Sequence, residues 1–202
     1  MVDNRLVLAT HNRHKTEEFK TLLADLRVEV ITLDRFPQVG EIIEDADTLE
    51  GNARKKAEEV FRATGLPSLA DDSGLEVHYL GGEPGVYSSR YAGLSATYRD
   101  NVRKLLMRLR GVPPRRRAAR FRCALSFVAP NNVRLSAEGI LKGVIIESPR
   151  GTNGFGYDPI FLPDESSKTL AEMTSEEKNL LSHRARAVRE IVPSLLSFFQ
   201  TK

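Results

Sequence analysis

The chain has 202 residues, of which 41% are hydrophobic and 28% charged, and its formal net charge is +3. This composition is typical of one globular domain, or one domain in two lobes, and it excludes collagen-like and disordered chains. The single cysteine, Cys123, excludes an internal disulfide and a cysteine-rich zinc site. No apolar run approaches the ~18 residues that a membrane-spanning helix needs. We therefore expect a cytoplasmic protein.

The first third of the sequence alternates short strands with amphipathic helices. Residues 5–10 form a β-rich run, and apolar residues over 19–26 recur at the spacing of one helical face. Residues 28–33 are predicted to form the next strand. A second helical stripe over 53–61 is ended by Gly65. This alternation favours an α/β architecture.

The middle of the chain is richer in strands. We predict a strand over 75–80 and a helix over 98–109. Residues 121–129 and 133–146 read as two long antiparallel strands joined by a short turn. These strands predict a β-rich second lobe over roughly 115–150.

Two helices are predicted near the C-terminus. Thr174 and Glu177 have the spacing of a capping box, so a helix is expected after Thr174. Pro193 suits the first turn of a further helix.

Positive charge is concentrated in residues 101–150, which hold twelve Lys and Arg against two Glu. The densest part runs from Arg115 to Arg122. One interpretation is a nucleic-acid surface. The other is a solvated linker and an edge strand that arginines protect from aggregation. The absence of an aromatic platform, a helix-turn-helix, a zinc finger or an RRM pattern favours the second interpretation.

The connection between the first strand and the first helix carries polar residues suited to an anion. A helix start offers backbone N–H groups and the positive end of the helix dipole, which together bind phosphate. The alternative is an ordinary Asn or Thr cap beside an exposed lysine. The segment consists of Thr10, His11, Asn12, Arg13, His14 and Lys15.

Two further segments are rich in carboxylates. Asp71 and Asp72, followed by Ser73 and Gly74, place adjacent carboxylates at an expected turn. A second acidic group precedes the second helix. Oxygen ligands suit a hard ion such as Mg²⁺ or Mn²⁺, although a plain turn and a solvated face are the simpler interpretations. The second group consists of Glu41, Glu44, Asp45 and Asp47.

A glycine-rich segment over 151–159 combines backbone freedom with aromatic rings. Its glycines permit close backbone approach to a ligand, and Phe155 and Tyr157 can stack on a base. The alternative is the start of a strand with aromatics in the core. Further along, Lys178, His183 and Arg184 are expected near one side of the helix after Thr174; by themselves they are typical of a solvated surface.

In combination, these segments resemble the Ham1 family of inosine triphosphate pyrophosphatases, also called XTP/dITP diphosphatases, over nearly the whole chain. The order and spacing of five motifs make the resemblance specific. The chain departs from the family pattern at three positions. His11 stands where glycine is usual, and Asn12 is expected to supply the left-handed conformation instead. Ala46 stands where glycine is common, and Gly51 where glutamate is common. The motifs are Thr10/Asn12/Lys15, residues 44–53, residues 70–74 with residues 84–93 behind them, residues 154–159, and residues 182–184.

The resemblance implies a two-lobed α/β fold of the Maf/Ham1 type, with a long mixed β-sheet flanked by helices and a central nucleotide cleft. It implies a homodimer as well. The implied reaction is hydrolysis between the α and β phosphorus atoms of ITP, dITP or XTP, which releases a monophosphate and pyrophosphate. This activity would cleanse the nucleotide pool before such bases enter DNA or RNA.

The resemblance also implies roles for individual residues. Glu44 and Asp72 would hold Mg²⁺, with Mn²⁺ as an alternative, and Asp72 would act as the base toward water. Asp71 is either a second carboxylate ligand or a turn former. Phe155 would stack on the base. The residues that would contact the triphosphate are Thr10, Asn12, Lys15, Lys56 and Ser73. Those that would contact the base edge are Asp158, Lys178, His183 and Arg184. The expected substrate site is completed by His11, Arg13, His14, Gly156 and Tyr157.

Donors at the base edge would accept a 6-oxo purine and leave the amino group of adenine facing another donor. Two rival functions remain at this point. A Maf-like pyrophosphatase for pyrimidine or modified nucleotides would share the phosphate and metal residues. A nucleic-acid-binding protein would instead use the patch from Arg115 to Arg122, with affinity that falls steeply with salt.

Overall fold

The computed structural model describes residues 4–200 and divides the chain into two compact units. Unit 1 comprises the described residues up to Asp72, together with Cys123–Gly139 and the residues from Arg184 on. Unit 2 comprises Ser73–Arg122 and Ile140–His183. Residues 115–150, where we expect a β-rich second lobe, are therefore shared between both units, because the two long strands in this range run through both.

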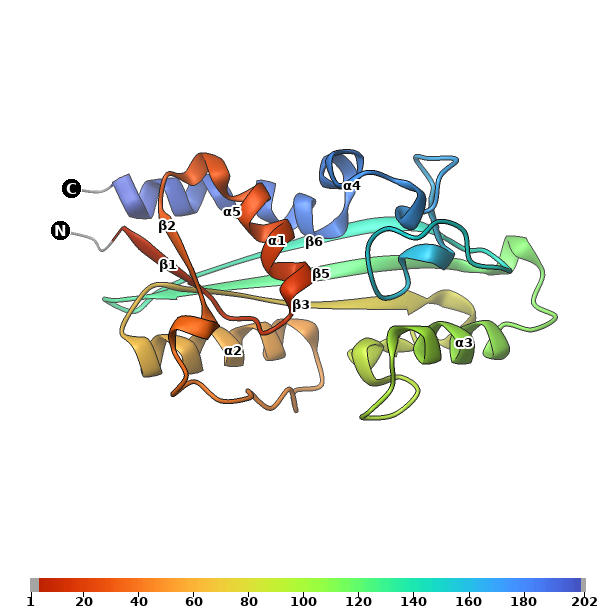
Figure 1. Cartoon of the computed structure of the whole chain (residues 1–202), viewed down its shortest axis with the longest axis horizontal. Coiled ribbons are helices and arrows are strands. Elements are labelled where there is room, and N and C mark those ends of the chain that lie inside the picture. The colour runs from red at the N-terminus through yellow and green to blue at the C-terminus, as the bar shows by residue number, and fades with distance from the viewer. Residues whose placement is uncertain (1–3, 201–202) are drawn as a thin grey trace. The chain divides into compact units, whose positions relative to one another are not determined.

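The strands form one mixed sheet in the order β2-β1-β3-β5-β6-β7, with β4 beside β3 (Figure 1). The pairs β1–β2 and β1–β3 are parallel, whereas β3–β4 and β6–β7 are antiparallel. The expected mixed α/β fold is thus confirmed. The strands are β1 (Arg5–Leu8), β2 (Glu29–Thr32), β3 (Ser68–Val77), β4 (Pro84–Gly85), β5 (Ala118–Ala129), β6 (Val133–Ile145) and β7 (Phe161–Pro163).

Five α-helices cover the sheet in the described residues, and two of them correct the sequence prediction. The helix after Thr174 begins with the predicted capping box but ends at Leu181, because Ser182 has extended backbone angles. Pro193 lies inside the last helix instead of starting one, since a buried apolar stripe continues past it. The helices are α1 (Arg13–Leu22), α2 (Leu49–Thr64), α3 (Tyr98–Arg108), α4 (Ser175–Leu181) and α5 (His183–Gln200).

Residues 71–74, where we expect a turn, instead form the middle of β3. The strand predicted over 75–80 is also shifted, because β3 begins at Ser68 and ends at Val77. Its neighbours Leu69, Ala70, Leu75 and Val77 are buried. Burial of this apolar sequence on both faces outweighs the turn preference of Asp, Ser and Gly, as is usual for a central strand.

The core of unit 1 follows the alternation of side chains along β1. Leu6 and Leu8 pack with the apolar stripes of α1 and α5, and Val7 and Ala9 pack with α2. Figure 1 shows α1 and α5 on one side of β1 and α2 on the other. This two-sided packing places the loop after β1 and the middle of β3 within reach of helices from both faces.

Unit 2 has a core of its own. Leu75 and Val77 of β3 belong to it, with Leu105 and Leu109 of α3 and Phe161 of β7. In the described part of the chain, none of the helices combines the length and the apolar character needed to cross a membrane.

Candidate functional site

The loop after β1 enters α1 through an asparagine cap. Asn12 Oδ1 accepts the backbone N–H groups of His14, at 3.0 Å, and Lys15, at 3.3 Å. Thr10 Oγ1 in turn accepts the N–H of Asn12 at 3.2 Å. The cap is therefore confirmed, whereas the exposed lysine expected beside it is wrong, because Lys15 keeps only 14% of its side chain exposed. The left-handed conformation expected at Asn12 is wrong, because its φ of −79° and ψ of 109° are extended, which a cap requires.

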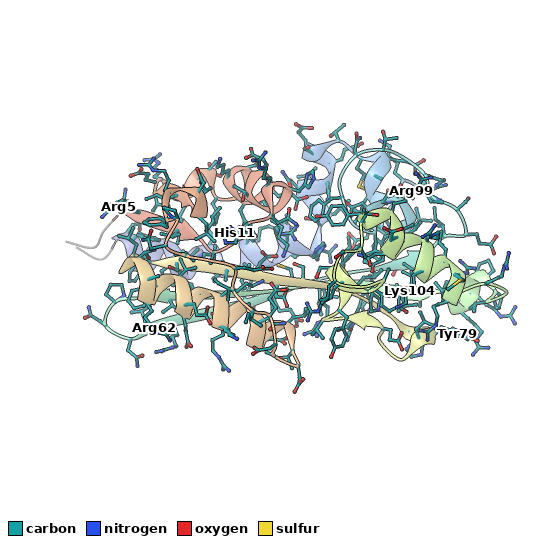
Figure 2. All side chains as sticks on the ribbon, turned by 60° about the horizontal axis from the view of Figure 1, so that its bottom comes forward. Arg5, His11, Arg62, Tyr79, Arg99 and Lys104 are labelled. Carbon is teal, nitrogen blue, oxygen red and sulfur yellow. The ribbon has the colours of Figure 1, made fainter. Side chains whose placement is uncertain are left out.

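The remaining residues of this loop point outward. His11, labelled in Figure 2, has Nε2 3.3 Å from the carbonyl oxygen of Gly40. Arg13 and His14 are exposed at the start of α1. This part of the predicted substrate site is therefore accessible to solvent.

The next residue of α1, Lys15, is held by a buried carboxylate. Its Nζ lies 2.9 Å from Asp71 Oδ2. The same oxygen lies 3.4 Å from Nη2 of Arg184, at the start of α5, and the guanidinium of Arg184 also pairs with Glu18 of α1. The side chains of Asp71 and Arg184 are 0% and 1% exposed. Charges from α1, β3 and α5 thus alternate in sign.

On the α2 side, the adjacent carboxylate has different partners. Asn52 Nδ2 donates to Asp72 Oδ2 at 3.1 Å, and Lys56 Nζ lies 3.5 Å from Asp72 Oδ1. Lys56 also pairs with Glu44, which comes from the loop before α2. Asn52 and Lys56 are one helical turn apart, so α2 presents both to β3.

The two adjacent aspartates are shifted in opposite directions. Burial raises the pKa of Asp72, aided by the charges of Glu44 and Asp71 and only partly opposed by Lys56 and Lys15. Burial would also raise the pKa of Asp71, but Lys15 and other nearby cations outweigh it and hold this pKa well below the usual range. A carboxyl with a raised pKa is better suited to proton transfer near neutral pH.

The acidic groups fit one hard cation with two protein ligands. Glu44 and Asp72 both contact the ammonium of Lys56, so one positive centre can be shared by both carboxylates. Two carboxylates with substrate phosphates are the usual ligand set of Mg²⁺. Residues 4–200 contain no cluster of three or more His, Cys, Asp or Glu arranged for a metal. Of the remaining acidic loop, Asp45 pairs with Lys55 at the surface.

In unit 2, a second group of predicted residues gathers around Asp158. Its Oδ2 accepts the N–H of Phe155 at 2.9 Å and lies 2.7 Å from Nζ of Lys178 on α4. Gly154 has a positive φ of 72°, and a Cβ there would lie 2.2 Å from the same oxygen. The glycine is therefore required by Asp158 itself, without reference to a ligand.

The ring of Phe155 is flanked by two side chains. Nζ of Lys178 lies 4.8 Å from its centroid, and the ring of Tyr98, at the start of α3, lies 5.9 Å away. Lys178 is thereby fixed by a carboxylate and a ring together, as a cation–π contact requires.

Two predicted substrate residues are core residues of unit 2. Tyr157 is 4% exposed, and its hydroxyl donates to the carbonyl of Ser88 at 2.9 Å. The ring of His183 stacks on Phe121 at 4.7 Å. Of the others, Gly156 has a positive φ and Ser73 is half-buried in β3. For Tyr157, the core interpretation of the aromatics therefore holds.

Lys178, His183 and Arg184 do not share one helix face. Ser182 separates α4 from α5, so Lys178 lies on one helix and the other two begin the next. Lys178 joins Asp158 in unit 2, whereas Arg184 joins Asp71 in unit 1. The prediction of one common side was wrong because the extended Ser182 interrupts the helix.

Three partners of these groups were not predicted. Glu18 lies one turn after Lys15, and Asn52 lies one turn before Lys56, so helical spacing from a predicted lysine is the signal that could have found them. No local signal marks Tyr98.

The arginine-rich segment is largely engaged within unit 2. Arg117 is 5% exposed, and its guanidinium donates to the backbone carbonyls of Val112 and Leu109. Arg120 and Arg122 both pair with Glu76. The expected edge strand is therefore wrong, because β5, which carries Arg120 and Arg122, lies between β3 and β6 in the sheet. The expected solvated linker is wrong at Arg117, because that residue is buried.

Known proteins resemble this chain over most of its length. The model of the Ham1 family matches residues 6–194. The dITP/XTP pyrophosphatase of Geobacter sulfurreducens is 48% identical over 91% of this chain and 92% of its own length, and that of Bacillus subtilis is 46% identical over 92% and 93%.

Solved structures resemble the chain closely as well. A HAM1 protein from Coxiella burnetii has a TM-score of 0.87 at 40% identity, covering 98% of this chain and 100% of its own. The Ham1 protein of Staphylococcus aureus has a TM-score of 0.85 at 36% identity, covering 96% and 99%. The chain therefore belongs to the Ham1 family.

Proposed function

We propose that this protein hydrolyses ITP, dITP and XTP to the nucleoside monophosphate and pyrophosphate, and so removes these non-standard purines from the nucleotide pool. The names of its curated relatives support this reaction. The observation that carries it is the charged group of unit 1, where Glu44 and Asp72 share Lys56 and where Lys15 is held by Asp71. Carboxylates for a cation and ammonium groups for phosphates are what a triphosphate requires.

In this proposal, the polyphosphate is bound from both faces of the sheet of unit 1. Lys15 and Lys56 neutralise phosphate charge, and each is already oriented by a carboxylate. Thr10, Asn12 and Ser73 provide further polar contacts. Charge neutralisation and alignment are the main sources of catalysis in reactions of phosphates, so positioned cations contribute directly to rate.

Glu44 and Asp72 are the residues proposed to hold Mg²⁺, or Mn²⁺ in its place. The bound ion would neutralise phosphate oxygens and align them for attack. Asn52 holds one oxygen of Asp72 and thereby sets the plane of the carboxylate. We assign to Asp72 the role of base, which takes the proton of the attacking water.

The base is proposed to bind in unit 2. Phe155 stacks on it, and Lys178 donates to its 6-oxo group while Asp158 holds the ammonium in place. An amino group at the same position, as in adenine, would face a donor and leave it unpaired. The assignment of His183 and Arg184 to the base edge rests on the resemblance alone, since both are buried and Arg184 contacts Asp71 in unit 1.

The proposal is tested with the purified protein, Mg²⁺ and a panel of ITP, XTP, dITP, GTP, ATP, dTTP and UTP, with pyrophosphate release as the readout. We expect ITP, dITP and XTP to give the highest kcat/KM. If dTTP or UTP is the best substrate, the base assignment fails and a Maf-like activity replaces it. Sub-micromolar binding of DNA or RNA at physiological salt, with no turnover of any nucleotide, would instead favour a nucleic-acid-binding protein.

We propose further that the protein acts in the cytoplasm as a homodimer. The homodimer rests on the family resemblance, whereas the cytoplasmic location rests on the composition of the sequence. Light scattering on the purified protein measures the oligomeric state, and a monomeric mass at micromolar concentration contradicts the dimer.

A further inference from the structure

Asp71 and Asp72 are neighbours in β3, yet their carboxylates contact helices on different sides of that strand. Successive side chains of a strand point to opposite faces of the sheet. Asp72 accordingly meets Lys56 of α2. Asp71 meets Lys15 of α1 and Arg184 of α5. The two neighbouring aspartates therefore form ion pairs with different helices.

The carboxylate of Asp71 is buried, whereas the side chain of Lys15 that it binds is partly exposed. The side chain of Asp71 is 0% exposed, whereas Lys15 keeps 14% of its side chain exposed. An ammonium group has three donors, so Lys15 can donate to Asp71 and still donate to a phosphate oxygen. A lysine side chain has a flexible four-carbon stem, and a fixed acceptor restricts the positions of its charge.

Asp71 is also a poor place for a divalent cation. Two cations, Lys15 and Arg184, already lie within 3.4 Å of one of its oxygens. A metal ion at the same carboxylate would be repelled by both of them. On the other side of the strand, the ammonium of Lys56 contacts two carboxylates, those of Glu44 and Asp72.

We propose that Asp71 is a positioning residue, which fixes the ammonium of Lys15 for a phosphate group of the substrate and does not ligate the metal. This inference rests on the proposed triphosphate pyrophosphatase function. It resolves the two roles that the sequence left open for Asp71, since the residue is neither a turn former nor the second carboxylate ligand. Arg184 anchors the same carboxylate from α5 and so stiffens it.

The test is a double-mutant cycle on Asp71→Asn and Lys15→Met, with kcat and KM measured for ITP. Each single variant is expected to raise KM by about 10-fold with a smaller change in kcat, because an interaction made in both the bound substrate and the transition state is lost. The double variant should be no more than about 2-fold worse than Lys15→Met, because Asp71 acts through Lys15.

Mn²⁺ binding without nucleotide, measured by titration calorimetry, gives a readout that does not depend on activity. Asp71→Asn should keep the affinity of the wild type within about 2-fold, whereas Asp72→Asn should lower it by about 10-fold or more, as expected for loss of a ligand. Asp71→Glu keeps the charge but moves the carboxylate. If Asp71→Asn does not fold, Asp71→Glu must show the same raised KM and unchanged Mn²⁺ affinity.

Glu76→Gln is the matched control, because Glu76 also pairs with two cations, Arg120 and Arg122, but lies in unit 2. It should leave KM unchanged. Three results would overturn the inference in a protein whose wild type hydrolyses ITP. They are additive losses in the cycle, a wild-type KM for both Asp71 variants, and loss of Mn²⁺ affinity in Asp71→Asn. A wild type that hydrolyses no nucleotide overturns the proposed function and this inference together.

Discussion

The two groups of residues proposed to bind the nucleotide are built in different ways. In unit 1, the charges come from α1, β3, α5, α2 and the loop before α2, and they alternate in sign. In unit 2, Asp158 and Phe155 belong to one loop, and only Lys178 and Tyr98 come from elsewhere. The polyphosphate group thus depends on long-range packing, whereas the base group depends largely on one local turn. Substitutions should separate the two groups by what they change.

The largest expected effect is that of Asp72→Asn in unit 1. It removes the charge assigned to metal binding and proton transfer but preserves the shape and the bond from Asn52. We expect kcat to fall by about 10³-fold with a nearly unchanged melting temperature, in the range typical for loss of a general base. Pyrophosphate release and thermal unfolding measure the two quantities. Wild-type turnover would remove Asp72 from the mechanism.

Breaking the buried pair of unit 2 should cost more stability than breaking an exposed pair of the same length. Lys178–Asp158 and Lys55–Asp45 are both separated by 2.7 Å, but the former side chains are 7% and 4% exposed and the latter 32% and 65%. Lys178→Met leaves a buried carboxylate without its cation, so the free energy of unfolding should fall by about 3 kcal/mol.

Lys55→Met is the control for that experiment, and denaturant unfolding should show no resolvable change for it. Lys178→Met should also narrow the preference for ITP over ATP, since the donor to the 6-oxo group is gone. Equal loss of stability in both variants would mean that burial does not distinguish the two pairs.

Phe155→Ala should separate base binding from catalysis. Loss of one stacking ring costs about 1 to 3 kcal/mol of binding, and KM for ITP should rise by the corresponding factor of about 5 to 150. The value of kcat should change little, because the charged group of unit 1 is intact. An unchanged KM with a large drop in melting temperature would make Phe155 a core residue like Tyr157.

The smallest effect is expected at two positions that differ from the family pattern, Ala46 and Gly51. A Cβ at Gly51 would lie 2.8 Å from the Cβ of Ala46, whose N–H donates to Asn52 at 2.9 Å. Gly51→Ala should therefore displace the loop that carries Glu44 and lower stability by about 1 kcal/mol, as overpacking does. Ala46→Gly added to Gly51→Ala should restore the melting temperature. If the double variant is no better than the single one, the two positions are independent.

Much of the fold and many of the site residues could be predicted from local patterns. Periodicity identified α1, α2 and α3, and the capping box at Thr174 is present as predicted. The ends of elements were harder, because the extended Ser182 interrupts the helical pattern, whereas Pro193 lies inside a helix whose buried apolar stripe continues past it. Propensity is a weak guide where a long apolar stripe is buried.

The sequence by itself determined the kinds of chemistry available, since carboxylates, lysines and an aromatic ring in ordered motifs already predict a site for a cation, a polyphosphate and a base. Only the tertiary structure decided which residue contacts which. Arg184 meets Asp71 across 113 positions and Glu18 across 166, and no local pattern encodes such a pairing. The alternation of side chains in β3 then assigns Asp71 to α1 and α5 and Asp72 to α2, because a strand, unlike the expected turn, directs consecutive residues to opposite faces.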